Sequence, residues 1–186
     1  MHNASAPRGI ARRLLPAIGT ACLSTLICIG QAAAAPPNDS QILGIYIQVN
    51  SFDVETALLG KSQANSDEVR ALAQHVASDH AGVRQGAFAL AEKCKVTPEL
   101  PADRSAAASE HANVLVTLMA LKGAEFDKAY LKHEVAFHRA AIAAVKTALL
   151  PSAQCADLQA HFRDVLPAFE HHLKMTEDLA AKLGVM

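Results

Sequence analysis

The chain has 186 residues, a formal net charge of −1, and 19% charged and 51% apolar residues. This is the composition of an ordinary globular protein with room for one domain, and its balanced charge argues against nucleic acid as a partner. Aromatic residues make up only 4% and tryptophan is absent, whereas the abundant Ala, Leu and Val favour helices over sheets. We therefore predict an all-α fold.

Residues 1–34 are predicted to be a signal peptide. Three arginines precede the apolar run LLPAIGTACLSTLICIG, which ends in QAAAA with the small residues that signal peptidase accepts. We expect cleavage after Ala34, which leaves a domain of residues 35–186 in the bacterial periplasm or outside the cell. Pro16 and Gly19 make the apolar run marginal as a permanent span, although an uncleaved anchor is the alternative. No stable membrane span is expected after cleavage.

The remaining chain is predicted to form four long amphipathic helices and one short helix. Ser66 in NSDEV is a suitable N-cap, and acidic residues follow it in the first helical turn. Two prolines in KVTPELPADRS interrupt the helical pattern, while Gly123, Pro151 and Gly184 mark later helix ends. We expect the long helices over residues 40–64, 66–93 and 124–150 and from within SAQCAD to residue 183, and the short helix over residues 106–121.

The lengths of the connections favour a ferritin-like four-helix bundle. Tight links join the first helix to the second and the third to the fourth, whereas about 30 residues join the two halves, as in bundles with one crossover. In this arrangement the long crossover connection contains the short helix. An up-down-up-down bundle is the alternative, with the short helix folded as a cap at one end.

Each long helix carries a side chain of metal-ligand type on an apolar row. His80 interrupts the row of the second helix, and His172 interrupts the row of the fourth. On the third helix, Glu134 and His138 lie one turn apart on the same side. On the first helix, Glu55 lies in a row of apolar residues and is expected to point inward.

These five side chains are predicted to meet at mid-bundle. With a crossover, the second and third helices begin at the same end, so depths can be compared at about 1.5 Å per residue. His80 and His138 lie about 14 residues from that end, and Glu55 and Glu134 about 9 to 10, a spread of about 7 Å. His172, counted from the opposite end of its helix, falls near the glutamates.

A core cluster of imidazole and carboxylate is a ligand set for a divalent transition metal such as zinc, copper, iron or manganese. The alternative is a metal-free network in which histidine and glutamate satisfy one another and set the register of the helices. The E-x-x-H pair of ferritins is absent.

Met175 is expected to fill the core, and solvated surface positions are expected for His75, His111, His133, His161 and His171.

The segments SDEVRALAQHVASDH, FDKAYLKHEVAFH and VLPAFEHHL together resemble a bacterial family of secreted domains of unknown function. Its members are often labelled outer-membrane or periplasmic proteins, and the resemblance implies a ferritin-like fold over residues 39–183. The family pattern has an Asp-His pair on the second and third helices and a histidine after Leu-Pro on the fourth. Asp79 and His80 match the first pair, and His138 matches the second although Phe137 replaces its aspartate. His172 matches the third.

The sequence favours a secreted periplasmic bundle that binds a transition metal through His80, His138, His172, Glu134 and Glu55, in metal handling or envelope stress. The rival function is a metal-free structural or interaction module. An oxidative di-metal enzyme ranks third, because it would need more carboxylates than Glu55 and Glu134.

After removal of the signal peptide two cysteines remain, in a compartment where disulfides persist. Cys94 lies at the end of the second helix and Cys155 at the start of the fourth. With a crossover these ends are neighbours, whereas in an up-down-up-down bundle they lie a helix length of about 40 Å apart. We therefore predict a Cys94–Cys155 disulfide together with the crossover.

Overall fold

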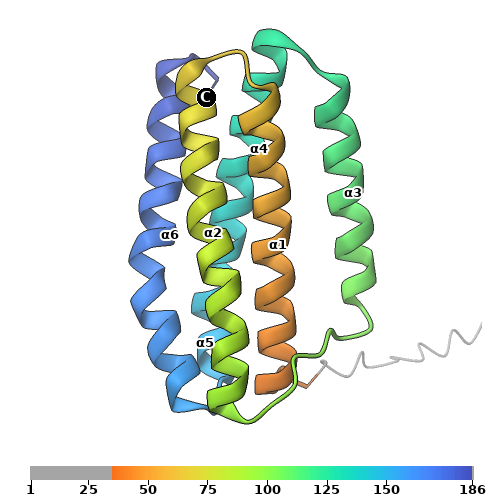
Figure 1. Ribbon diagram of the computed structural model, residues 1–186, viewed down its shortest axis with the longest axis vertical. Coiled ribbons are helices and arrows are strands. Elements are labelled where there is room, and N and C mark those ends of the chain that lie inside the picture. The colour runs from red at the N-terminus through yellow and green to blue at the C-terminus, as the bar shows by residue number, and fades with distance from the viewer. Residues whose placement is uncertain (1–34, 186) are drawn as a thin grey trace, which may run out of the picture. The chain divides into compact units, whose positions relative to one another are not determined.

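The computed structural model describes residues 35–185, which form a bundle of helices without strands (Figure 1). The predicted signal peptide lies outside the described residues. The helices are α1 (Asp39–Gln63), α2 (Asp67–Cys94), α3 (Arg104–Ala120), α4 (Gly123–Ala144), the π-helical turn η1 (Val145–Leu149), α5 (Leu150–Ser152) and α6 (Ala156–Lys182).

The chain direction identifies the bundle as ferritin-like (Figure 1). α1 and α2 form one antiparallel pair, and α4 and α6 form the other. α3 runs along the outside of the bundle and returns the chain to the end at which α2 begins, so α2 and α4 run in the same direction. The predicted all-α, ferritin-like bundle with one crossover is confirmed, and the up-down-up-down alternative is wrong.

The predicted helix ends agree closely with the structure. Ser66 caps α2 by accepting a hydrogen bond from the backbone N–H of Glu68, and Asp127 of α4 accepts the N–H groups of Asn65 and Ser66 at 2.8 Å each. The third long helix differs, because it widens into η1 and continues past Pro151 to Ser152. Proline disrupts α-helical hydrogen bonding, and a π turn is a usual accommodation of such an irregularity.

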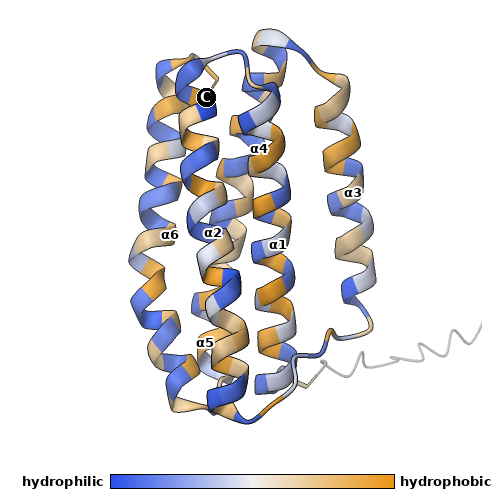
Figure 2. Cartoon of the chain, viewed as in Figure 1, coloured by the Kyte–Doolittle hydropathy of each residue, from blue (hydrophilic) through white to orange (hydrophobic). Residues whose placement is uncertain are grey.

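Two apolar clusters fill the bundle, one toward each end, and bands of apolar and polar residues alternate along the helices (Figure 2). One cluster includes Tyr46, Phe162 and Phe169, and the other includes Phe126 and Leu131. Along each long helix, most of the buried polar side chains lie between the residues of one cluster and those of the other; Asp127 is an exception. Among the described helices, none combines the length and apolar character needed to cross a membrane.

Two glycines let other segments pack closely against α1. A Cβ on Gly60 would lie 2.6 Å from the ring of Tyr130, so α4 can approach α1 at this height. A Cβ on Gly44 would lie 2.0 Å from the carbonyl oxygen of Glu99, in the segment that crosses the start of α1. The N–H of Glu99 also donates to the carbonyl of Ser40 at 3.1 Å. Both contacts require a residue without a side chain.

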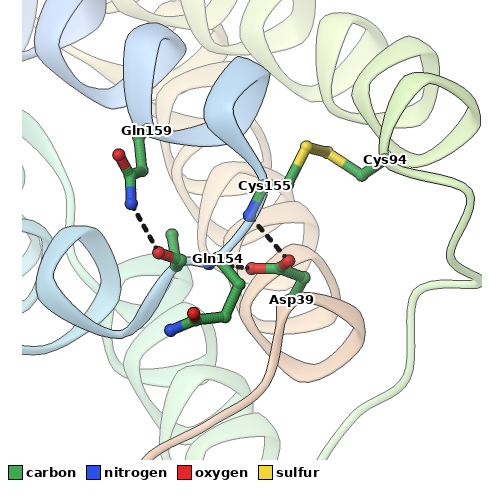
Figure 3. The surroundings of a disulfide bond; sticks show 6 residues. Asp39, Cys94, Gln154, Cys155 and Gln159 are labelled. Atoms are coloured by element: carbon green, nitrogen blue, oxygen red, sulfur yellow. Dashed lines mark hydrogen bonds between the residues drawn. A yellow bond between two sulfur atoms is a disulfide. The ribbon is translucent and has the colours of Figure 1, made fainter.

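A disulfide joins Cys94, at the end of α2, to Cys155, the N-cap residue of α6, with a Cα–Cα distance of 5.7 Å (Figure 3). The same end of the bundle is tied to α1, because the carboxylate of Asp39 accepts the backbone N–H groups of Gln154 and Cys155 at 2.8 and 2.9 Å. The predicted Cys94–Cys155 disulfide is confirmed. Because these helix ends meet only in the crossover topology, the disulfide and the fold support each other.

Candidate metal centre

Three buried histidines meet at the centre of the bundle, each from a different helix. His80 of α2, His138 of α4 and His172 of α6 are 5%, 1% and 2% exposed. One ring nitrogen of each lies within 4.8 Å of those of the other two. His80 Nε2 and His172 Nδ1 are only 3.2 Å apart. The structure therefore brings together the three histidines expected from their apolar rows.

Two buried carboxyl groups lie beside the histidines. Asp53 of α1 places Oδ2 3.2 Å from His80 Nε2 and 3.6 Å from His138 Nε2. Glu134 of α4 places Oε2 3.7 Å from His138 Nδ1. Asp53, Glu134 and His138 also offer ligand-type atoms within 4.8 Å of one another. The cluster thus contains three imidazoles and two carboxyl groups from four helices.

In two of the imidazoles, the ring nitrogen that points away from the other histidines lies beside a hydrogen-bond acceptor. His138 Nδ1 lies 3.0 Å from the backbone carbonyl oxygen of Glu134, and His172 Nε2 lies 3.0 Å from Asp79 Oδ2. A carbonyl or a carboxylate can only accept a hydrogen bond. The proton of neutral His138 is therefore on Nδ1, and that of neutral His172 is on Nε2.

Asn50 fixes the proton of the third imidazole in the same way. Its Nδ2 donates to the backbone carbonyl of Tyr46 at 2.8 Å, so its Oδ1 is the atom 2.9 Å from His80 Nδ1. Reversing the amide would place two acceptors against each other at the Tyr46 carbonyl. Neutral His80 therefore carries its proton on Nδ1 and donates it to Asn50.

With these protons assigned, the unprotonated nitrogens are His80 Nε2, His138 Nε2 and His172 Nδ1. Their lone pairs face the centre of the cluster. Asp53 adds carboxylate oxygens to the same space. Among the described residues, both oxygens of Asp53 and of Glu134, together with His138 Nε2 and Tyr130 Oη, make no hydrogen bond although all are buried. Buried acceptors that face one another without a donor are costly. A cation bound among them would satisfy them.

Burial also shifts the ionisation of these groups. It lowers the pKa of His80 to about 2, with repulsion from His138 and His172 adding to the effect, and it lowers the pKa of His138 to about 4. Burial raises the pKa of Asp53 and, with the nearby Asp53 charge, that of Glu134. In the protein alone, a proton kept by Glu134 would let it donate to Asp53. Burial therefore disfavours charge on all of these groups when no cation is bound.

The expectation that Glu55 points into the core is wrong. Its side chain is 54% exposed, and its Oε2 lies 2.9 Å from Nε2 of His111 on α3. The inward carboxyl group of α1 is Asp53, two residues earlier. Asp53 lies in the structure on a row of buried positions three and four residues apart, with Leu43, Tyr46, Asn50, Ala57 and Gly60.

The remaining histidines only partly match their predicted surface positions. His111 is 8% exposed, stacked on Phe52 at a ring-centroid distance of 4.2 Å, because α3 covers this side of α1. His161 lies 3.0 Å from the hydroxyl of Tyr46. His75 and His171 are exposed. Met175 packs against an apolar cluster, as expected.

An apolar cavity of about 90 Å³ adjoins the cluster on the side of α1 and α4. Asn50, His80, His138 and Arg104 are among its polar lining residues, and Phe137 is part of its apolar lining. On this side of the centre the chain therefore offers a largely apolar surface.

Comparison with known proteins places the chain among domains without an assigned activity. Residues 29–179 match the model of a family described as a domain of unknown function, DUF4142. The crystal structure of a DUF305 protein of Streptomyces coelicolor, described as a candidate secreted protein, superposes with a TM-score of 0.64 at 17% identity. The match covers 78% of this chain and 93% of the other and concerns the fold. No curated protein matches the sequence.

Proposed function

The chain belongs to the DUF4142 family, whose function is unknown, and we propose that it is a secreted protein that binds one transition-metal ion at the centre of its bundle. His80, His138 and His172 are the proposed ligands, and Asp53 is the proposed carboxylate ligand. Glu134 lies next to this set and is a further candidate. Glu55 is not part of the proposal, because it lies outside the cluster.

The observation that supports the proposal best is the direction of the three imidazole lone pairs. The outer nitrogen of each imidazole donates a hydrogen bond, to the side-chain oxygen of Asn50, the backbone carbonyl of Glu134 or the carboxylate of Asp79. Metal-binding histidines are typically held in this way, which fixes the tautomer and raises the basicity of the ligating nitrogen. Three imidazoles with one carboxylate suit zinc, copper or iron. A bound ion would supply the positive charge that four convergent acceptors need.

Secretion is proposed on three grounds. The N-terminal segment has the arginines, apolar run and small residues of a signal peptide, and the structurally similar Streptomyces protein is described as a candidate secreted protein. The Cys94–Cys155 disulfide is also typical of an oxidising compartment. Metal handling or protection of the cell envelope in the periplasm is the role that fits these features.

Metal content and thermal stability test the proposal together. Untagged protein purified from the periplasm should contain close to one equivalent of a transition metal by elemental analysis. After chelator treatment, Zn(II) or Cu(II) should raise the melting temperature, since a ligand that binds only the folded state stabilises it. The double variant His138→Ala/His172→Ala should lose this response, whereas the exposed His171→Ala should keep it.

A metal-free polar network is the second candidate, and the carboxyl pair supports it. If Glu134 keeps a proton and donates it to Asp53, the carboxyl pair is satisfied without a cation, and the role of the cluster is to fix the register of the helices. This function predicts no metal in the purified protein and no thermal response to added metal. His138→Ala/His172→Ala would then lower stability without changing any metal response.

A further inference from the structure

His172 belongs to a second group of ligand-type side chains, which lies at the surface between α2 and α6. His75, Asp79 and His172 offer atoms within 4.8 Å of one another. The side chains of His75 and Asp79 are 47% and 43% exposed, whereas that of His172 is 2% exposed. α2 and α6 pack side by side (Figure 1). The group is therefore open to solvent on one side and reaches the core on the other.

The contacts within this group form a continuous path. His75 and Asp79 lie one turn apart on α2, with His75 Nε2 3.5 Å from Asp79 Oδ2. The same carboxylate oxygen lies 3.0 Å from His172 Nε2. The ring of His75 packs edge-on against that of His172, with their centroids 5.3 Å apart.

The opposite side of the His172 ring completes the path into the core. His172 Nδ1 lies 3.2 Å from His80 Nε2, inside the central cluster. The two nitrogens of one imidazole thus face two different groups, one open to solvent and one buried. Among the described residues, His172 is the single member that these two groups share.

From this arrangement we propose that His75, Asp79 and His172 form an entry site for a divalent transition-metal cation, which His172 then transfers to the central site. This inference rests on the proposed function. Two imidazoles and a carboxylate are suitable ligands for such a cation, and their exposure allows it to shed water in steps. A buried site with no such route would exchange its ion only when helices separate.

The position of the ring proton of His172 differs between the entry site and the central site, so His172 can bind an ion in only one of the two sites at a time. An ion on Nε2 of His172 requires the ring proton on Nδ1, where it can be donated to His80. An ion on Nδ1 requires the proton on Nε2, where Asp79 accepts it. During transfer His172 loses one proton to solvent and gains one at the other nitrogen through the half-exposed Asp79. His172 therefore serves one ion at a time, and each chain holds one ion.

Stopped-flow binding of Co(II) to the chelator-treated mature protein tests the entry site, because bound Co(II) is followed by its absorbance. His75 belongs to the entry group and meets the central cluster only through the ring of His172, which the two groups share. We expect His75→Ala to slow uptake about tenfold by removing one of the three ligands at the entrance, with an unchanged equilibrium Kd. Release must then slow by the same factor. His171→Ala, an exposed histidine outside the group, is the matched control and should load at the wild-type rate.

The outcomes separate the two proposals. Uptake by His75→Ala at the wild-type rate, or slowing of His171→Ala by the same factor, would overturn the entry site alone. A weakened Kd in His75→Ala would also overturn it, by making His75 part of the final site, as would tight binding of two ions per chain. If the wild-type protein takes up no Co(II), the proposed central site fails and the entry site fails with it.

Discussion

Gly60 of α1 lies against the ring of Tyr130 of α4 so closely that a Cβ on the glycine would come within 2.6 Å of a ring carbon. Tyr130 is completely buried, so its ring has little room to move. The contact sets the separation of α1 and α4 at a point about two turns of α1 from Asp53 and about one turn of α4 from Glu134. The geometry of the carboxyl pair therefore depends on a residue that has no side chain.

Gly60→Ala should destabilise the protein. Alanine is favoured over glycine inside a helix by about 1 kcal/mol, but forcing a methyl group into a packed core costs about 1–3 kcal/mol. Gly86→Ala is the matched control, because nothing lies within 4 Å of a Cβ at that position of α2. Urea unfolding should show a lower free energy of unfolding for Gly60→Ala and an equal or higher one for Gly86→Ala. Equal gains in both variants would contradict the close packing.

Asn50→Leu should weaken metal binding without removing a ligand. Asn50 positions His80 by accepting its Nδ1 proton, and loss of such a partner typically lowers metal affinity about 10- to 100-fold. Competition with a chromophoric chelator measures the Kd. Asn113→Leu on the exposed side of α3 is the control and should bind as the wild type does. Wild-type affinity in Asn50→Leu would show that His80 is not oriented by this contact.

Asp53→Asn and Glu55→Gln form a pair that tests which carboxylate of α1 belongs to the centre. Asp53→Asn removes the charge 3.2 Å from His80 Nε2 and should lower metal affinity markedly. Glu55→Gln alters only the contact with His111 at the surface and should leave the metal affinity unchanged. Isothermal titration of both chelator-treated variants checks this. The reverse order of affinities would restore Glu55 as the ligand and refute the observed orientation of α1.

Removal of the disulfide should lower stability by a large amount. Cys94 and Cys155 are 61 residues apart in sequence, and closing a loop of this length stabilises a fold by about 4 kcal/mol on the chain-entropy model. Cys94→Ser/Cys155→Ser should show this loss in urea unfolding, and the wild type in reductant should show a similar loss. Peptide mapping that finds both thiols free in secreted protein would contradict the prediction.

Local sequence signals predicted the helices and four of the five members of the cluster, the three histidines and Glu134. Ser66 and Gly184 mark helix ends because capping depends on the residue at the end itself. His80, His138 and His172 interrupt rows that are otherwise apolar, and each of their helices buries one face. A polar residue in such a row must point inward, so these positions could be predicted without knowledge of neighbouring helices.

For α1, the sequence alone did not show which face of the helix points into the core. The structure shows α1 packed against the bundle on one side and against α3 on another, so its apolar residues lie on more than one face. Phe52 and Glu55 face α3, where His111 meets both. Asp53 faces the bundle. Because the position of α3 is a tertiary feature, the residues of α1 alone do not distinguish the two faces.

The position of α3 has a consequence for proteolysis. Cys94 precedes α3 in the chain and Cys155 follows it, so a protease that cuts this outer helix produces two polypeptides that stay covalently joined. Each fragment is one antiparallel helix pair, with Asp53 and His80 on the first and Glu134, His138 and His172 on the second. A nicked molecule would run as one species until reductant is added, and it would still contain every residue of the central cluster.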